Sequence, residues 1–320
     1  MAATRCPADR LGWLMSGLLI IMFTPCFLGA CSAASAAPAR QPTTPVARES
    51  TIGLLLSSID DPLYVSLQNG AIESASRLGV ELIIHDASGN VARQLQQIEE
   101  LLALGVDAIV LNPVDSAEIR AGVQQVNEAA IPIVTVERNV RGASVIAHVA
   151  PDNIAGGEMA AAYLAEILQG EGNVAELVGI PGTSAAQDRG SGFNRVIRTY
   201  PGIMLISREV ANFDRSEGRR VFAAMLERHP EIDAVFAHND AMILGAIEAA
   251  QDVGRAGAII FVGFDATRDA VTAIENGDLR ATVAQQPAEM GRLAIELAFN
   301  VLQGDDVPES VAVDLALVTR

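Results

Sequence analysis

The sequence predicts an α/β protein built from two doubly wound parallel sheets. From Thr51 onward, short apolar runs that are too short for helices alternate with longer segments of helical spacing. Apolar strands that alternate with helices indicate parallel sheets covered on both faces. The number of strands exceeds what one doubly wound sheet ordinarily holds, so two such units are expected. A TIM barrel is the alternative, which the same strand count disfavours.

The first half of this region contains four predicted strands with helices between them. Gly79 and Gly105 stand where the first two helices should stop, because glycine readily adopts the left-handed conformation of a helix C-terminus. The predicted strands lie within 51–58, 81–87, 108–113 and 131–138, and the helices at 62–78, at 91–104 and up to residue 129.

The second half repeats this alternation. Six further strands and six helices follow, and the last strand is expected as one segment near the C-terminus. The predicted helices are 152–168, 184–200, 214–228, 241–253, 267–275 and one that ends at residue 302, and the strands lie within 173–179, 203–210, 234–240, 259–265, 281–287 and 311–318.

Size and charge narrow the function classes. A chain of 320 residues with 50% hydrophobic residues can form two domains of ordinary size with sizeable cores. Its net charge of −17 argues against nucleic-acid binding, because phosphates would be repelled. The three cysteines, Cys6, Cys26 and Cys31, all lie near the start, so the remaining body has no disulfide framework.

The N-terminal segment is typical of an export signal. Two arginines precede an apolar run from Leu11 to Ala30, and Leu-Gly-Ala-Cys at its end resembles a bacterial lipobox with Cys31 as the lipidated residue. We therefore expect residues 1–30 to be a signal peptide, and residues 31–50, which are small, polar and Pro-bearing, to be a lipidated flexible tether. A plain transmembrane anchor is the alternative, because the run is close to the ~20 residues that span a bilayer.

Polar side chains gather where the predicted strands end. In open parallel sheets, ligands bind outside the carboxyl ends of the strands. Carboxylate, amide and guanidinium groups predominate there, together with a few aromatic rings, and such groups suit a ligand covered in hydroxyls. The sequence contains no GxSxG, GxxxxGK[ST] or HExxH motif, so no enzyme chemistry is indicated. No cofactor or metal site is expected.

Eight segments carry a resemblance to a known family. The segments are DPLYVSLQNGA, NPVDS, IPIVTVER, GTSAAQDRGSGF, ANFDR, AVFAHNDAMILGA, VGFDAT and ATVAQQP. The resemblance covers the body from residue 51 to the C-terminus, and it is to the type I periplasmic binding proteins, most closely the ribose-binding branch. The resemblance implies two α/β lobes joined by a three-crossover hinge, an N-terminal lobe of 51–151 plus 286–314 and a C-terminal lobe of 152–285 plus 315–320.

The resemblance also implies a set of ligand-binding residues in the cleft between the lobes. They are Asp61, Leu63, Tyr64, Glu137, Arg138, Arg189, Phe213, Asn239, Asp265 and Gln285. Ribose binders usually have an amide where Asp61 stands, an aromatic residue where Leu63 stands and an aspartate where Glu137 stands. These departures open the specificity to a sugar alcohol or to a different pentose or hexose.

Four of these positions also have ordinary structural interpretations. Asp265 could cap the helix predicted to begin near Thr267. We assign ligand contact to Asn239 and helix capping to its neighbour Asp240. Glu137 and Arg138 are not expected to pair directly with each other, because adjacent strand residues point to opposite faces.

The resulting functional expectation is the extracytoplasmic substrate-binding component of a carbohydrate ABC importer. It would bind a monosaccharide, either a pentose such as ribose or a related sugar or polyol, and close by hinge motion. It would dock as a monomer on the permease subunits and touch the membrane only through its lipid, at the outer face of the cytoplasmic membrane or in the periplasm. A receptor for a sugar-like signal, in chemotaxis or quorum sensing, is the alternative. The ligand-sensing domain of a repressor shares this fold, but it would need a DNA-binding helix-turn-helix before Thr51, where an export signal stands instead.

Overall fold

The computed structural model of the protein describes residues 50–320. The predicted signal peptide, the lipidation site Cys31 and nearly all of the tether lie outside the described residues. Within residues 50–320, none of the helices has the length and apolarity that crossing a membrane requires.

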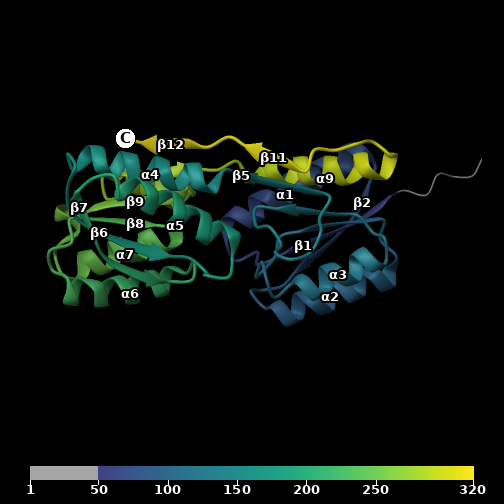
Figure 1. The fold of residues 1–320 in the computed structure, drawn as a ribbon, viewed down its shortest axis with the longest axis horizontal. Helices are drawn as coiled ribbons and strands as arrows, with labels where there is room; N and C mark the ends of the chain where they lie inside the picture. Colours follow the sequence, from purple (N-terminus) through teal and green to yellow (C-terminus); the bar gives the residue numbers. More distant parts are fainter. Residues whose placement is uncertain (1–49) are drawn as a thin grey trace, which may run out of the picture. The chain divides into compact units, whose positions relative to one another are not determined.

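The first lobe is built on a six-stranded parallel sheet with the order β11-β5-β4-β3-β1-β2. Helices α1 and α9 pack on one face of this sheet, where their apolar side chains share a core with β1, and helices α2 and α3 pack on the other face (Figure 1). The elements are β1 (Thr51–Leu56), α1 (Pro62–Leu78), β2 (Glu81–Asp86), α2 (Val91–Leu104), β3 (Ala108–Leu111), α3 (Arg120–Glu128), β4 (Ile133–Val136), β5 (Ala147–Pro151), α9 (Pro287–Gln303) and β11 (Ser310–Val313).

The second lobe repeats the plan with the order β12-β10-β9-β8-β6-β7, in which only β12 runs antiparallel to its neighbour. Helices α4 and α5 cover one face, and α6, α7 and α8 cover the other. The elements are α4 (Asn153–Ile167), β6 (Glu171–Val178), α5 (Ser184–Ile197), β7 (Gly202–Val210), α6 (Arg215–Arg228), β8 (Ala234–Ala237), α7 (Asp240–Asp252), the short 3-10 helix η1 (Ala256–Ala258), β9 (Ile260–Asp265), α8 (Arg268–Asn276), β10 (Ala281–Ala284) and β12 (Ala316–Thr319).

The chain passes between the two lobes three times. It crosses at Asp152, between β5 and α4, then at 285–286, between β10 and α9, and finally at 314–315, between β11 and β12. Figure 1 shows β11 and β12 one after the other along the top of the view, each at the edge of a different sheet. The predicted fold class, two doubly wound lobes with a three-crossover hinge, is therefore confirmed.

Two strand predictions differ from the structure. Ala147–Pro151 forms β5, which the sequence pattern does not predict, because a histidine interrupts its short apolar run and a proline ends it. The segment 311–318, expected as one strand, is two: β11 pairs with β5 in the first sheet, and β12 pairs with β10 in the second. Alternation of apolar residues does not reveal that a strand changes sheets halfway along.

Helix ends follow the predicted chemistry. Gly79 and Gly105 end α1 and α2 with φ of 68° and 69°, the left-handed region where glycine carries no steric penalty. The predicted stops at these two glycines are confirmed. At the other end, most helices start at a side chain that accepts a backbone N–H, as Asp61 does for α1.

Candidate functional site

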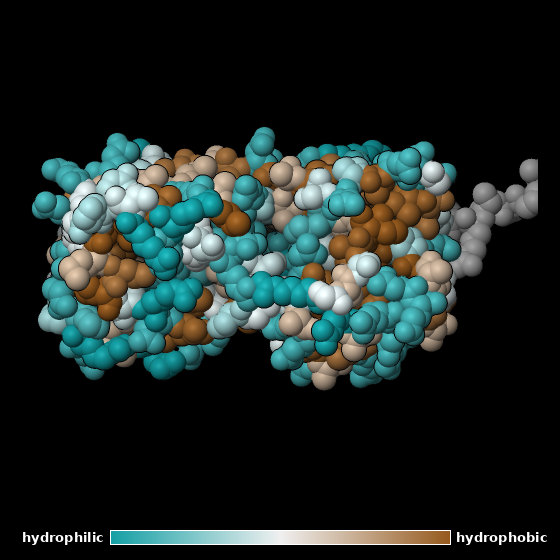
Figure 2. Space-filling view, viewed as in Figure 1, coloured by the Kyte–Doolittle hydropathy of each residue, from teal (hydrophilic) through white to brown (hydrophobic). Residues whose placement is uncertain are grey.

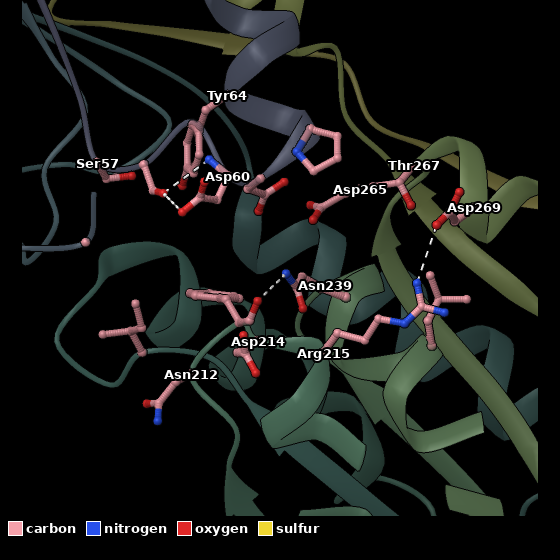
Figure 3. A pocket seen from close by; sticks show the side chains of 18 of the residues that line it. Ser57, Asp60, Tyr64, Asn212, Asp214, Arg215, Asn239, Asp265, Thr267 and Asp269 are labelled. Carbon is pink, nitrogen blue, oxygen red and sulfur yellow. Dashed lines mark hydrogen bonds and ion pairs between the residues drawn. The ribbon is translucent and has the colours of Figure 1, made fainter. Parts of the chain in front are cut away.

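A cleft of about 580 Å³ lies between the lobes, at the carboxyl ends of their strands. That volume falls within the ~300–1,000 Å³ typical of small-molecule sites. Figure 3 shows Tyr64 and Asp60 of the first lobe facing Asn239, Asp265 and Asp214 of the second across this space. On the face seen in Figure 2, hydrophilic side chains dominate the surface where the two lobes meet.

The structure brings the predicted site residues together. Nine of the ten surround one inner pocket beside the cleft: Asp61, Leu63, Tyr64, Glu137, Arg138, Arg189, Phe213, Asn239 and Asp265. The tenth, Gln285, does not line this pocket, but it donates a hydrogen bond to Asp265, which does. The inner pocket has a volume of only about 10 Å³, roughly enough for one water molecule. A ligand that contacted all nine would therefore need these side chains to move apart.

Glu137 is the acidic centre of the inner pocket. It is 3% exposed and accepts hydrogen bonds from the Tyr64 hydroxyl at 3.0 Å, from Asn112 Nδ2 at 3.2 Å and from Arg189 Nη2 at 3.4 Å. Since Arg189 belongs to the second lobe, this last bond joins the lobes directly. The Tyr64 hydroxyl is held protonated, because burial raises its pKa well above 10.

The expectation that Glu137 and Arg138 do not pair is wrong. Arg138 Nε lies 3.2 Å from Glu137 Oε2 as an ion pair, although the angle leaves that N–H without a hydrogen bond. The strand rule fails here because β4 ends at Val136, and Glu137 has a left-handed φ of 62° that turns both side chains to the same side. Arg138 also lies over the Tyr64 and Phe213 rings, at 5.5 and 5.4 Å from their centroids.

Arg189 extends from helix α5 into the pocket and is 2% exposed, so it does not lie on a solvated helix face. Its Nε donates to Asn153 Oδ1 at 2.8 Å, and its Nη1 donates to the His238 carbonyl at 2.7 Å. The guanidinium stacks on the Phe264 ring, 3.9 Å from its centroid. Every face of this cation is thereby fixed before any ligand contacts it.

Asp265 faces Arg189 from the end of β9. Its Oδ1 lies 3.5 Å from Arg189 Nη1 and accepts a hydrogen bond from Gln285 Nε2 at 2.6 Å. Burial raises the pKa of Asp265 well above its usual range, against the opposing influence of Arg189. Gln285 Oε1 is buried and has no hydrogen-bond partner, so one acceptor remains available next to the pocket. Thr267, and not Asp265, caps the following helix α8.

Asp61 has two roles in the structure. Its Oδ1 caps α1 by accepting the Leu63 backbone N–H at 2.9 Å, while Pro62 occupies the first helical position. Its carboxylate also lines both the inner pocket and the outer cleft, and burial raises its pKa above the usual 3.8. Asp61, Glu137 and Asp265 place three carboxyl groups near two guanidinium groups, an arrangement suited to binding several hydroxyls at once.

The assignment of the α7 cap to Asp240 is wrong. Asn239 is the N-cap, because its Oδ1 accepts the Met242 N–H at 3.0 Å, and its Nδ2 donates to the Phe213 carbonyl at 3.3 Å. Asp240 is instead buried beneath the site, where it accepts from Thr282 Oγ1 and the Thr267 N–H, both at 2.7 Å. Asn239 still lines the pocket, so capping and pocket lining fall on one residue.

Two further residues support the site without having been predicted as part of it. Asn112 is fully buried, accepts the Ser57 N–H at 3.1 Å and donates to Glu137. Its place at the end of β3 was a usable signal. Asn153 begins helix α4 and holds Arg189, but nothing in its sequence neighbourhood marks it. Phe213, with φ of 61°, closes the pocket by packing its ring against Gly179, where a Cβ would lie only 2.1 Å from that ring.

Comparisons with known proteins agree with this geometry. A family model for the periplasmic binding protein domain matches residues 52–306. The ribose import binding protein RbsB of Bacillus subtilis (strain 168) is 39% identical over 302 residues, 94% of this chain and 98% of that protein. The ribose import binding protein RbsB of Escherichia coli (strain K12) is 40% identical over 271 residues, 84% of this chain and 90% of that protein.

Solved structures give the same result. An ABC transporter solute binding protein from Bacillus halodurans C-125 with bound myo-inositol superposes with a TM-score of 0.81 at 34% identity, covering 85% of this chain and 94% of that one. The fructose-binding periplasmic domain of a hybrid two-component system superposes with a TM-score of 0.82 at 29% identity, covering 85% and 91%. With matches over nearly the whole described region, this chain belongs to the periplasmic binding protein family.

Proposed function

We propose that the protein is the substrate-binding component of an ABC importer for a monosaccharide or a related polyol. The ligand binds between the lobes, and the lobes close on it by rotation at the three crossovers. The observation that carries this proposal is the cluster of buried charges that both lobes contribute to one pocket, in which Glu137 of the first lobe meets Arg189 of the second. A ligand with several hydroxyls would bridge these groups and stabilise the closed arrangement.

The pocket chemistry supports a neutral, hydroxyl-rich ligand. Carboxylates accept from hydroxyls, guanidinium groups donate to them, and Asn239 and Gln285 can do both. The Tyr64 and Phe213 rings offer apolar surfaces for the C–H groups of a ligand. The relatives that are named for ribose, and the structure with bound myo-inositol, fall within this ligand class.

The exact ligand depends on three positions. Leu63 is buried beside Tyr64 and provides no second aromatic face, and Glu137 is committed to Tyr64, Asn112 and both arginines. Asp61 adds a carboxylate at the border of the pocket and the cleft. Together they favour a ligand with an additional hydroxyl donor near Asp61, such as a polyol or a sugar other than ribose.

Location and partners extend the same proposal. Membership of this family implies a site of action outside the cytoplasm. A signal peptide at residues 1–30, lipidation at Cys31 and a tether to residue 50 would hold the protein at the membrane surface as a monomer that docks on permease subunits. The lobes would comprise 51–151 with 286–314, and 152–285 with 315–320. We propose no catalytic activity and no cofactor.

A receptor for a sugar-like signal remains the second candidate. The observation that favours it is the likeness to the periplasmic domain of a two-component system, which shows that this fold serves sensing as well as uptake. A deletion of the gene separates the two roles: loss of ligand uptake supports transport, whereas intact uptake with a lost transcriptional or motility response supports signalling.

Calorimetry tests the binding function directly. Residues 32–320 would be titrated with ribose, allose, fructose, xylitol and myo-inositol. Calorimetry is chosen over tryptophan fluorescence because the one tryptophan, Trp13, lies outside this segment. One-to-one binding with a Kd of about 1 μM or tighter, about −8 kcal/mol, is the expected result for one of these ligands. If none bound at millimolar concentration, the carbohydrate assignment would be wrong.

A further inference from the structure

Two of the three crossovers carry an amide side chain that is bonded to a charged residue of the site. Asn153, next to the first crossover, accepts from Arg189 Nε at 2.8 Å, and Gln285, at the second, donates to Asp265 at 2.6 Å. Arg189 and Asp265 are also paired with each other at 3.5 Å. The segments that must rotate when the lobes move are thereby connected to the ion pair of the second lobe.

Asn153 is placed to direct the Arg189 side chain. It is the first residue of α4, directly after Asp152, and is 6% exposed. Helix α4 packs closely on α5, since a Cβ on Gly157 of α4 would lie 2.1 Å from the Arg189 carbonyl oxygen. This close packing keeps the Asn153 amide and the Arg189 guanidinium in register.

The remaining contacts of Arg189 do not fix its Nε edge. The His238 carbonyl and the Asp265 carboxylate both contact Nη1, and Glu137 contacts Nη2. Asn153 Oδ1 is the acceptor that Nε has among the described residues. Without it, the buried Nε–H would lose its hydrogen bond, and the guanidinium plane could turn on its stack with Phe264.

From this geometry we propose that Asn153 is a positioning residue that sets ligand affinity by orienting Arg189. It does not line the inner pocket. It acts through Arg189, whose Nε–H it accepts from the neighbouring helix of the same lobe. The effect on ligand affinity rests on the proposed sugar-binding function. The effect on the orientation of Arg189 is tested by a measurement that needs no ligand.

Three substitutions at Asn153 separate positioning from general structural support. Asn153→Ala removes the acceptor and Asn153→Ser shortens it out of reach, whereas Asn153→Asp keeps an oxygen for Arg189 and adds a charge that the N-terminus of α4 favours. Asn173→Ala is the matched control in the same lobe. It removes the hydrogen bond from Asn173 Nδ2 to the Glu231 carbonyl. Asn173 lies near the amino end of β6, whereas the cleft lies at the carboxyl ends of the strands.

Calorimetry with the best-binding sugar of the panel gives the first readout. Asn153→Ala and Asn153→Ser should weaken binding at least tenfold, Asn153→Asp should restore it to within about threefold of the unsubstituted protein, and Asn173→Ala should leave it within the same range. Equal weakening by the Ala and Asp substitutions would overturn the proposal, as would an unchanged affinity in Asn153→Ala.

NMR of arginine Nε–Hε groups gives the second readout without any ligand. The Arg189 signal, identified by its absence in Arg189→Lys, should exchange slowly with water in the unsubstituted protein and in Asn153→Asp, and rapidly in Asn153→Ser. If no sugar binds but these exchange rates differ as expected, the proposed function fails while the positioning role stands. If the rates do not differ, the positioning role fails whatever binds. Should Asn153→Ala not fold, Asn153→Ser and Asn153→Asp still decide between these outcomes.

Discussion

The second lobe contains two networks of buried charge that are built alike but face different surroundings. One links Arg189, Asp265 and Gln285 and borders the cleft. The other centres on Glu176, which is fully buried in β6 and accepts from His238 Nε2 at 2.8 Å, Asn194 Nδ2 at 2.8 Å and Arg208 Nε at 2.9 Å.

The difference between them lies in how completely their polar atoms are paired. In the network around Glu176, both carboxylate oxygens of Glu176 have hydrogen-bond partners. Burial lowers the pKa of His238 below 6.5, and its neutral ring lies between Glu176 and the Gly179 N–H. In the network at the cleft, Gln285 Oε1 is left without a hydrogen bond, as is Arg138 Nε of the first lobe beside the same pocket. Full pairing indicates a structural role, and incomplete pairing beside a cleft indicates a place for a ligand.

The largest expected effect breaks the network at the cleft. Arg189→Met should weaken sugar binding by more than about 100-fold, about 3 kcal/mol, because it leaves Asp265 buried without its cation and removes one of the two cations that pair with Glu137. Calorimetry measures the affinity, and thermal unfolding in the absence of ligand serves as the control for folding. A folded Arg189→Met protein with unchanged affinity would remove Arg189 from the site.

A substitution in the network around Glu176 should affect the stability of the protein and not its affinity for sugar. Glu176→Gln should lower the free energy of unfolding by about 2 kcal/mol, since an amide cannot accept from His238, Asn194 and Arg208 together. Sugar affinity should change no more than about threefold. Denaturant unfolding and calorimetry on the same sample check both values, and a large loss of affinity at unchanged stability would reverse the comparison.

The pH dependence of stability sharpens the role of Asp240, which is buried beneath the cleft and accepts hydrogen bonds from Thr282 and Thr267. Burial raises its pKa from 3.8 to about 7. The folded state therefore keeps this proton to higher pH than the unfolded state does, and the free energy of unfolding falls as pH rises between these values. Over pH 6 to 8 the loss from Asp240 is about 1 kcal/mol.

Asp240→Asn cannot ionise and should remove that part of the slope. Burial raises the pKa of Asp265 as well, so a smaller decline of the same sign should remain in the variant. Urea unfolding at a series of pH values tests this, and the same slope in both proteins would show that Asp240 does not titrate in this window.

The smallest expected effect concerns contacts that join the lobes outside both networks. Ser184 at the start of α5 accepts the Asn139 N–H at 2.9 Å and donates its own N–H to Ser116 Oγ at 3.0 Å, and both partners belong to the first lobe. Ser184→Ala removes the first bond and should weaken binding by about threefold, because the closed arrangement becomes less populated.

Small-angle scattering of the ligand-free protein should show a larger radius of gyration in Ser184→Ala. Ser74→Ala, which changes a buried serine of α1 within the first lobe, is the control and should leave the radius unchanged. Identical scattering from all three proteins would mean that these contacts do not hold the lobes together.

Much of this architecture could be predicted from the sequence, because local signals decide it. Glycines at helix ends, caps and apolar runs place most elements, and polar strand ends indicate where a ligand binds, whereas the set of ligand-binding residues comes from the resemblance to the family. The errors arose where backbone conformation overrides local pattern. The positive φ of Glu137 places its carboxylate against Arg138. Near the C-terminus, the segment 311–318 supplies one strand to each of the two sheets. The bond from Asn153 to Arg189 joins two helices that only tertiary packing brings together.

The position of the last two strands has a consequence for how the chain matures. Residues 153–284 form all of the second sheet except its edge strand β12, so this lobe can largely fold while synthesis continues. The first lobe cannot, because α9 and β11 must return from the far end of the chain to pack with α1 and β5. A chain that stopped before residue 287 would leave the apolar face of α1 uncovered, and quality control by proteases should therefore act most strongly on C-terminal truncations.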